Sequence, residues 1–111
     1  MDNVKDDGYY LDKVLTDLQF LAEHTKGKTY DEIEADPVLT DCIMFRLIQI
    51  AENSDKLTPS FKTKHGELPW RELKGMRNRI VHDYGYVDLT IIYDTVMHGI
   101  PEMYDLLKKL I

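Results

Sequence analysis

The sequence predicts an all-α protein, a four- to five-helix up-and-down bundle, and three observations support this prediction. Apolar residues recur at spacings of three and four along four separate segments, which is the period of an amphipathic helix. Pro and Asp stand where helices would begin, and Gly stands where they would end. No segment alternates apolar and polar residues as a half-buried strand does. We therefore expect residues 1–111 to form a single domain around one core.

The first two helices are predicted over residues 9–28 and 36–57. In the first, Gly27 marks the end, and the apolar positions at helical spacing are Leu11, Val14, Leu15, Leu18 and Leu21. The second begins with Asp36 as the N-cap and Pro37 as the first helical residue, where a fixed φ and a missing N–H are tolerated. Because this helix is apolar on most sides, we expect it to be central.

The second half of the chain predicts a loop and two further helices. Residues 58–67 mix Pro, Ser, Thr and Gly without a period and are expected to be a loop. A third helix opens at Leu68-Pro69-Trp70 and is expected to end near Gly85. A fourth starts after Asp88, and Gly99 with Pro101 should interrupt or kink it before the last segment.

Composition limits the class of protein. The chain is 43% hydrophobic and 31% charged, which is typical of a folded soluble protein. Its single cysteine allows no intrachain disulfide, and no apolar run approaches the roughly 20 residues of a membrane helix. The first residues lack the apolar run of a signal peptide. We expect a cytoplasmic protein with no membrane association.

Only one of three segments of the chain has a net positive charge. The whole chain has a net charge of −6, which disfavours nonspecific binding to nucleic acid. Residues 60–82 nevertheless carry net +4, against −7 for residues 1–59 and −3 for residues 83–111. A solvated helix face and an anion-binding site both explain this segment.

The stretch GMRNRIVHDYG, residues 75–85, ends the basic segment and holds an arginine in an unusual position. At 100° per residue, Arg77 falls in the middle of an apolar arc formed by Leu73, Met76, Ile80, Trp70, Val81 and Tyr84. A guanidinium does not lose its charge, so Arg77 must meet an acid or an anion. A buried ion pair, with Glu52 as the candidate partner, and an anion site are both open.

His82 lies about 140° from Arg77 around an ideal helix, so one straight helix does not direct both at one target. Either the helix unwinds at His82 or the site combines residues from two copies of the chain. Asn78, four residues before His82, can hold the imidazole through a hydrogen bond across one turn.

These residues carry a resemblance to a known superfamily. Arg77 followed five positions later by His82, with polar Asn78 after the arginine, resembles the motif of HEPN domains. His82-Asp83-Tyr84 is similar to the H-x-Y of the HepT-like branch, and the flanking PWRELKGMRN, IPEMYDLL and RLIQIAENSDKL also resemble that branch. The likeness covers most of the chain from about residue 37. One departure is Gln49-Ile50-Ala51-Glu52, where relatives often have a glycine before Glu-Ala.

The resemblance implies a homodimeric, metal-independent ribonuclease of HEPN fold that is the toxin of a toxin–antitoxin pair. By position, Arg77 and His82 would be catalytic, and Asn78 and Arg79 would support them. The partner would be an MNT-type nucleotidyltransferase antitoxin that attaches AMP to Tyr84. Without the resemblance, Tyr84 would be interpreted as a core tyrosine with its hydroxyl at the edge.

The chemistry of the residues agrees with RNA cleavage by attack of the 2′-hydroxyl. A histidine transfers protons near neutral pH, and a guanidinium binds phosphate oxygens with two parallel hydrogen bonds. The four histidines, His24, His65, His82 and His98, have no metal-ligand spacing, so no metal or other cofactor is expected. The alternative is a HEPN-like module that binds nucleotides or partners a nucleotidyltransferase without cutting RNA.

Overall fold

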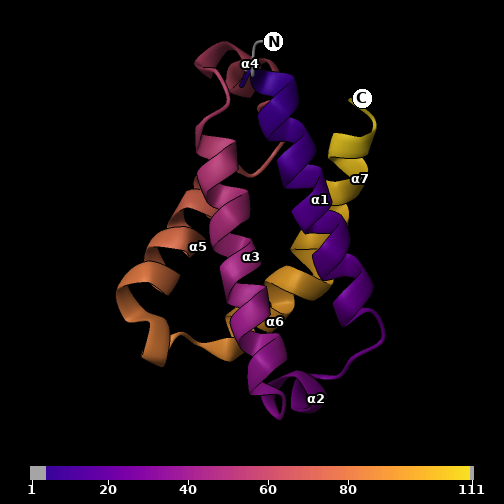
Figure 1. Cartoon of the computed structure of the whole chain (residues 1–111), viewed down its shortest axis with the longest axis vertical. Helices are drawn as coiled ribbons and strands as arrows, with labels where there is room; N and C mark the ends of the chain where they lie inside the picture. Colours follow the sequence, from indigo (N-terminus) through magenta and orange to yellow (C-terminus); the bar gives the residue numbers. More distant parts are fainter. Residues whose placement is uncertain (1–4, 111) are drawn as a thin grey trace.

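The computed structural model describes residues 5–110, and within that range the chain is helical with no strand. The helices run up and down, with α1 and α3 at the front of Figure 1 and α7 beside α1. The α-helices are α1 (Asp7–Thr25), α2 (Tyr30–Glu34), α3 (Pro37–Asp55), α4 (Pro59–Lys64), α5 (Trp70–Asp83), α6 (Leu89–Asp94) and α7 (Ile100–Lys108). The predicted all-α class is confirmed.

Local hydrogen bonds explain where the two long helices begin. The Asp6 side chain accepts from the backbone N–H of Tyr9 and caps α1. The Asp36 side chain accepts from the N–H of Leu39 and caps α3, whose first residue is Pro37 as predicted. After α1, Gly27 adopts a φ of +74°, a left-handed conformation that favours glycine.

Two short helices were not predicted, and the expectation of a loop over residues 58–67 is wrong for Pro59–Lys64. Helix α2 has a complete capping box between Thr29 and Glu32. Helix α4 is capped by Thr58, whose backbone N–H and hydroxyl both donate to the Asp7 carboxylate at 2.8 and 2.7 Å. A helix of five or six residues is too short to show a helical period in the sequence, so its caps and tertiary contacts determine whether it forms.

The last helical segment departs from a regular α-helix at the place where an interruption or a kink was expected, although the helix is not broken there. Helix α6 passes through a π-helical turn (Thr95–Gly99) directly into α7. The N–H of Ile100 donates to the carbonyl of Thr95, five residues earlier. The wider turn relieves the clash that the ring of Pro101 would cause in a regular α-helix.

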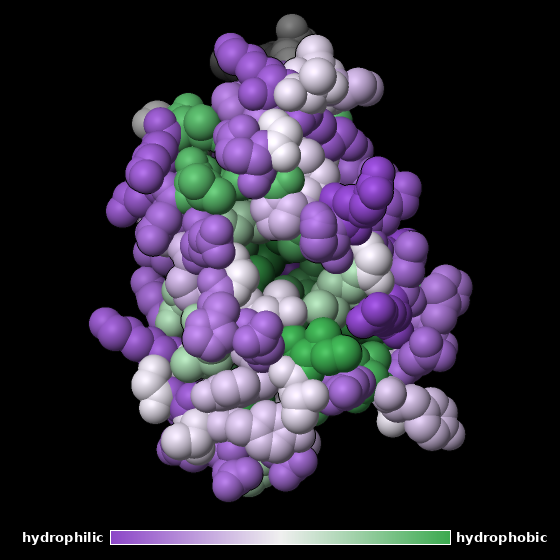
Figure 2. Space-filling view, turned by 180° about the vertical axis from the view of Figure 1, so that it is seen from behind, coloured by the Kyte–Doolittle hydropathy of each residue, from purple (hydrophilic) through white to green (hydrophobic). Residues whose placement is uncertain are grey.

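Helix α3 is central, as expected, because it packs against both α1 and α5. The core includes Val14, Leu18 and Leu21 of α1 and Ile43, Leu47 and Ile50 of α3. Helix α5 packs chiefly on α3, which leaves a hollow of about 260 Å³ between α5 and α7, lined by Leu73, Met76, Ile100 and Met103 among others. Figure 2 shows a hollow with apolar side chains at the centre of the back face.

Candidate functional site

Helix α5 carries the motif residues, and its buried stripe is narrower than the sequence predicts. Only Leu73 and Ile80 are buried among its fourteen residues, while Met76 is half-buried. Val81 and Tyr84 were expected in the apolar arc, but each is 47% exposed. The physical reason is that α5 rests mainly on one neighbouring helix, so part of its apolar arc has no other element packed over it.

Arg77 is held by two hydrogen bonds. Its Nε donates to Oε1 of Glu52 on α3 at 2.9 Å, and its Nη1 donates to Oδ1 of Asn78 at 2.9 Å. The predicted partner Glu52 is therefore confirmed. The pair is not buried, however, because the Arg77 and Glu52 side chains are 36% and 42% exposed. The guanidinium thus has a fixed direction and still reaches solvent, where it can meet an anion.

A small hollow of about 110 Å³ lies beside this ion pair. It is lined by Lys74 and Arg77 of α5 and by Ala51, Glu52 and Asp55 of α3. Two cations and two carboxylates balance there, so the hollow is not a strongly positive pocket by itself. Further positive charge would have to come from elsewhere to hold a polyanion firmly.

His82 is exposed near the end of α5, apart from the Arg77 contacts. Because the α-helix continues to Asp83, the first of the two alternatives, in which the helix unwinds at His82, is excluded. Asn78 bonds to Arg77 rather than holding the imidazole of His82. Arg79 lies on another side of α5, beside a hollow of about 170 Å³ that Met76, Tyr86 and Ile91 help to line. One copy of the chain therefore does not gather Arg77, Arg79 and His82 at one point.

Tyr84 starts a 3-10 helix (Tyr84–Tyr86) that follows α5, so the α-helix ends two residues before Gly85. The Tyr84 hydroxyl donates to Oδ1 of Asp41 on α3 at 2.5 Å. This hydrogen bond, with partial desolvation and the negative charge of Asp41, raises the pKa of Tyr84 above its ordinary value. The phenol therefore stays protonated, with its proton directed at a carboxylate.

Asp41 is a residue that the sequence analysis missed. It is 43 positions away from Tyr84, and no local pattern connects the two. The antiparallel packing of α5 on α3, with Arg77 matched to Glu52, was the signal that could have located it (Figure 1). The two helices joined by this contact also expose apolar side chains: Val38 is 80% and Phe45 56% exposed on α3, and Val81 is 47% exposed on α5.

Comparison with known proteins decides the family. The family model described as "Ribonuclease HepT-like" matches residues 14–110. The chain belongs to the HepT-like ribonuclease family. A protein of Caldanaerobacter subterraneus subsp. tengcongensis named as a candidate RNase is 35% identical over 102 residues, which is 92% of this chain and 91% of that protein. The probable ribonuclease HepT of Thermococcus cleftensis is 29% identical over 101 residues, which is 91% of this chain and 92% of that protein.

A third relative of this HepT-like chain is longer. The Methanocaldococcus jannaschii protein named as a gamma-glutamylcyclotransferase and candidate RNase is 30% identical over 96% of this chain, which corresponds to 48% of that protein. No solved structure matches this chain. Among residues 5–110, no helix has both the length and the apolar character to cross a bilayer. The same residues hold no cluster of three His, Cys, Asp or Glu side chains arranged as metal ligands.

Proposed function

We propose that this HepT-like chain is a metal-independent endoribonuclease in which Arg77 binds the scissile phosphate and His82 transfers protons. The observation that carries the proposal is the Arg77 side chain, held at Nε by Glu52 and at Nη1 by Asn78 while remaining partly exposed. A guanidinium fixed in this way is prepared to stabilise negative charge without reorganising. Names of relatives that include RNase or ribonuclease support the same activity.

The reaction needs no group beyond the RNA and protein side chains. The 2′-oxygen forms a bond to phosphorus while the bond from phosphorus to the 5′-oxygen of the next nucleotide breaks. A base takes the 2′-hydroxyl proton, and an acid gives a proton to the leaving 5′-oxygen. An imidazole does either, and a guanidinium stabilises the extra charge on the phosphoryl oxygens. The products carry a 2′,3′-cyclic phosphate and a 5′-hydroxyl.

The proposed active unit is a homodimer with its site between two chains. Arg77 and His82 lie about 140° apart on a helix that stays regular through both positions, so a second copy is the simplest source of convergence. Exposed Val38, Phe45 and Val81 offer an apolar surface on α3 and α5 beside these residues. A two-fold axis through this surface would bring two copies of Arg77 and His82 together.

The proposed regulation makes this chain the toxin of a toxin–antitoxin pair. An MNT-type nucleotidyltransferase antitoxin would transfer AMP from ATP to Tyr84. The Tyr84 Oη forms a bond to the α-phosphorus, pyrophosphate leaves, and Asp41 is placed to accept the phenol proton. The added phosphate and adenosine beside His82 would repel RNA and fill the site.

The test of cleavage compares two histidine variants on an RNA substrate, with and without chelator. His82→Ala should lose roughly 10²–10⁴-fold in rate, the usual contribution of general acid–base catalysis. His98→Ala is the matched control, because His98 is an exposed histidine that lies 3.8 Å from the Asp94 carboxylate. Full activity of His82→Ala, or activity abolished by chelator in the wild type, would refute the proposal. An inactive wild type that still binds a nucleotidyltransferase would favour the noncatalytic alternative.

A further inference from the structure

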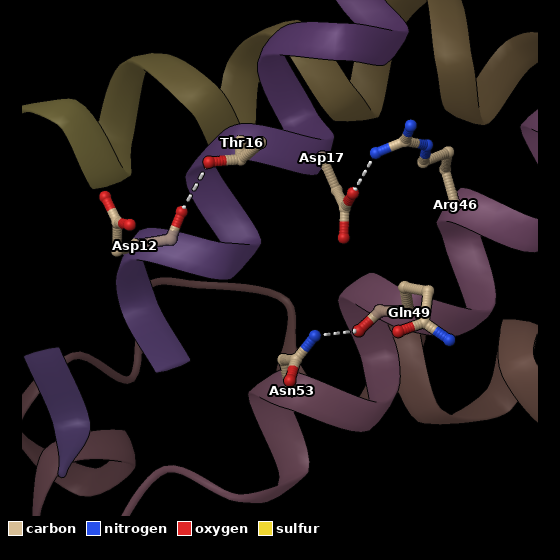
Figure 3. Close-up of polar contacts among 6 residues, drawn as sticks. All are labelled: Asp12, Thr16, Asp17, Arg46, Gln49 and Asn53. Atoms are coloured by element: carbon tan, nitrogen blue, oxygen red, sulfur yellow. Dashed lines mark hydrogen bonds and ion pairs between the residues drawn. The ribbon is translucent and has the colours of Figure 1, made fainter. Parts of the chain in front are cut away.

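A large hollow on the described part of the chain lies away from the motif helix, α5. A groove of about 490 Å³ runs between α1 and α3, in the size range of ligand sites. Its α1 wall includes Asp12, Thr16 and Asp17, and its α3 wall includes Arg46, Gln49 and Asn53. Figure 3 shows Asp17 and Arg46 meeting across the space between the two helices. No residue of the motif on α5 lines this groove.

The groove concentrates positive charge in an acidic protein. Four of its lining residues are cations, Lys5, Lys13, Arg46 and Lys56, and two are acids, Asp12 and Asp17. Arg46 is neutralised by Asp17, since Nη1 and Oδ1 lie 2.6 Å apart. Within residues 5–110, none of the three lysines forms an ion pair with a carboxylate. Three ammonium groups are therefore available to an anion in a chain of net charge −6.

Aromatic rings gather these ammonium groups at the groove. The Nζ atoms of Lys5 and Lys13 lie 5.7 and 5.2 Å from the centre of the Tyr9 ring. The Nζ of Lys56 lies 5.7 Å from the Tyr10 ring, and the two tyrosines pack edge to face with centres 5.1 Å apart. Cation–π contacts of this kind restrain lysines that would otherwise be free in solvent.

The floor of the groove is rigid and polar. Arg46 lies over the Phe20 ring at 3.9 Å while it binds Asp17, so its guanidinium is fixed on two sides. Asn53 is buried, and its amide nitrogen donates to the carbonyl of Gln49 at 3.0 Å. Lysines around tyrosine rings, together with amide side chains, match the phosphate, the base face and the base edge of a nucleotide.

We propose that this groove binds single-stranded RNA next to the cleavage site, with Lys13 and Lys56 on phosphates and Tyr9 against a base. This assignment rests on the proposed ribonuclease function for its substrate. Helix α3 connects the two places, because Gln49 and Asn53 line the groove while Glu52 holds Arg77. The groove supplies the positive charge that the balanced hollow beside Arg77 lacks.

Binding is measured by fluorescence anisotropy with a 2′-O-methyl RNA of about 12 nucleotides, a length within known single-strand site sizes. This RNA has no 2′-hydroxyl nucleophile, so the result does not depend on whether the chain cleaves RNA. The double variant Lys13→Gln/Lys56→Gln should bind at least about tenfold more weakly and lower the salt slope by about 1.4, since each single-strand phosphate contact contributes about 0.7. Lys26→Gln/Lys109→Gln removes the same amount of charge at exposed helix ends and should leave the affinity and the salt slope unchanged.

A second pair of variants tests the aromatic contact. Tyr9→Leu should weaken binding by about fivefold or more, because stacking on one base is lost, whereas Tyr9→Phe keeps the ring and should bind normally. Circular dichroism checks that each variant is folded. Equal loss in the two lysine double variants would overturn the proposal. So would displacement of the RNA by equimolar AMP, which would indicate a mononucleotide site, or by polyglutamate, which would indicate a general polyanion surface.

Cleavage kinetics then separate this inference from the proposed function. If the chain is a ribonuclease, Lys13→Gln/Lys56→Gln should raise KM for the RNA of about 12 nucleotides and leave kcat unchanged. A dinucleotide substrate, too short to reach the groove, should be cleaved equally by variant and wild type. A wild type that binds the RNA through these lysines but never cleaves it would refute the proposed function and leave the groove assignment standing.

Discussion

Removal of Glu52 tests whether the direction of Arg77 matters more than the stability of the ion pair. Glu52→Ala deletes the acceptor of the 2.9 Å bond from Nε and leaves Arg77 attached only to Asn78. Because the two side chains are 36% and 42% exposed, the pair contributes at most about 1 kcal/mol to the free energy of unfolding. Stability should therefore fall very little.

The effect on catalysis should be much larger. A guanidinium held by one bond rather than two samples other rotamers, and a displacement of about 1 Å of a positioning group can cost 10²-fold in rate. We expect Glu52→Ala to lower kcat by roughly 10- to 100-fold. KM should stay level or fall, because the variant also removes a negative charge beside the bound phosphate. Glu52→Gln keeps an oxygen acceptor and should retain more of the rate than Glu52→Ala.

The assay is single-turnover cleavage of a labelled RNA, combined with thermal unfolding followed by circular dichroism. Asp55→Ala is the matched control, since Asp55 lines the same hollow but pairs with Lys62 at 3.9 Å rather than with Arg77. A kcat for Glu52→Ala equal to that of wild type would refute the reasoning. A loss of several kcal/mol in stability would refute it too, because the rate would then report unfolding.

Four further outcomes are expected. Phe45→Glu should convert a dimer into monomers in analytical ultracentrifugation and abolish cleavage; a monomeric wild type that cleaves RNA would contradict this. Tyr84→Phe should retain ribonuclease activity yet show no AMP addition by intact mass after incubation with the antitoxin and ATP, unlike wild type. Asp41→Asn should lower the pKa of Tyr84 toward about 10 in an absorbance titration. In the wild type, the hydrogen bond stabilises the folded state below about pH 10, and this stabilisation is lost as the pH rises through the raised pKa of folded Tyr84. Ile80→Ala should cost about 2–5 kcal/mol in denaturant unfolding, since Ile80 is 0% exposed, against at most about 0.5 for Val38→Ala.

Signals close together in the chain predicted much of the fold. The caps at Asp36 and Asp88 act on N–H groups within three residues, so their effect can be read directly from the chain. Helical periods of three and four located the core of α1, where Leu11, Val14 and Leu18 are buried. Local signals did not predict helix α4 (Pro59–Lys64). A helix of six residues depends on its cap, Thr58, which is itself held by Asp7 at the start of α1.

The candidate site was predicted in part. The motif pointed to Arg77, His82 and Tyr84, and the rule that a guanidinium needs a counter-charge led to Glu52. The helical period overestimated the burial of Val81 and Tyr84. It shows which residues share a face of the helix but not how much of that face a neighbouring helix covers.

By itself, the sequence determined the all-helical class, the HepT-like family and the helix that carries the motif, because caps, periods and motif spacing act over a few residues. Only the tertiary structure decided that Asp41 meets Tyr84, that Asn78 turns to Arg77 rather than to His82, and that lysines from the start of α1 and the end of α3 surround one groove. These contacts depend on how far two packed helices slide along each other. That register is set by the sum of many core contacts, so no single stretch of the chain contains it.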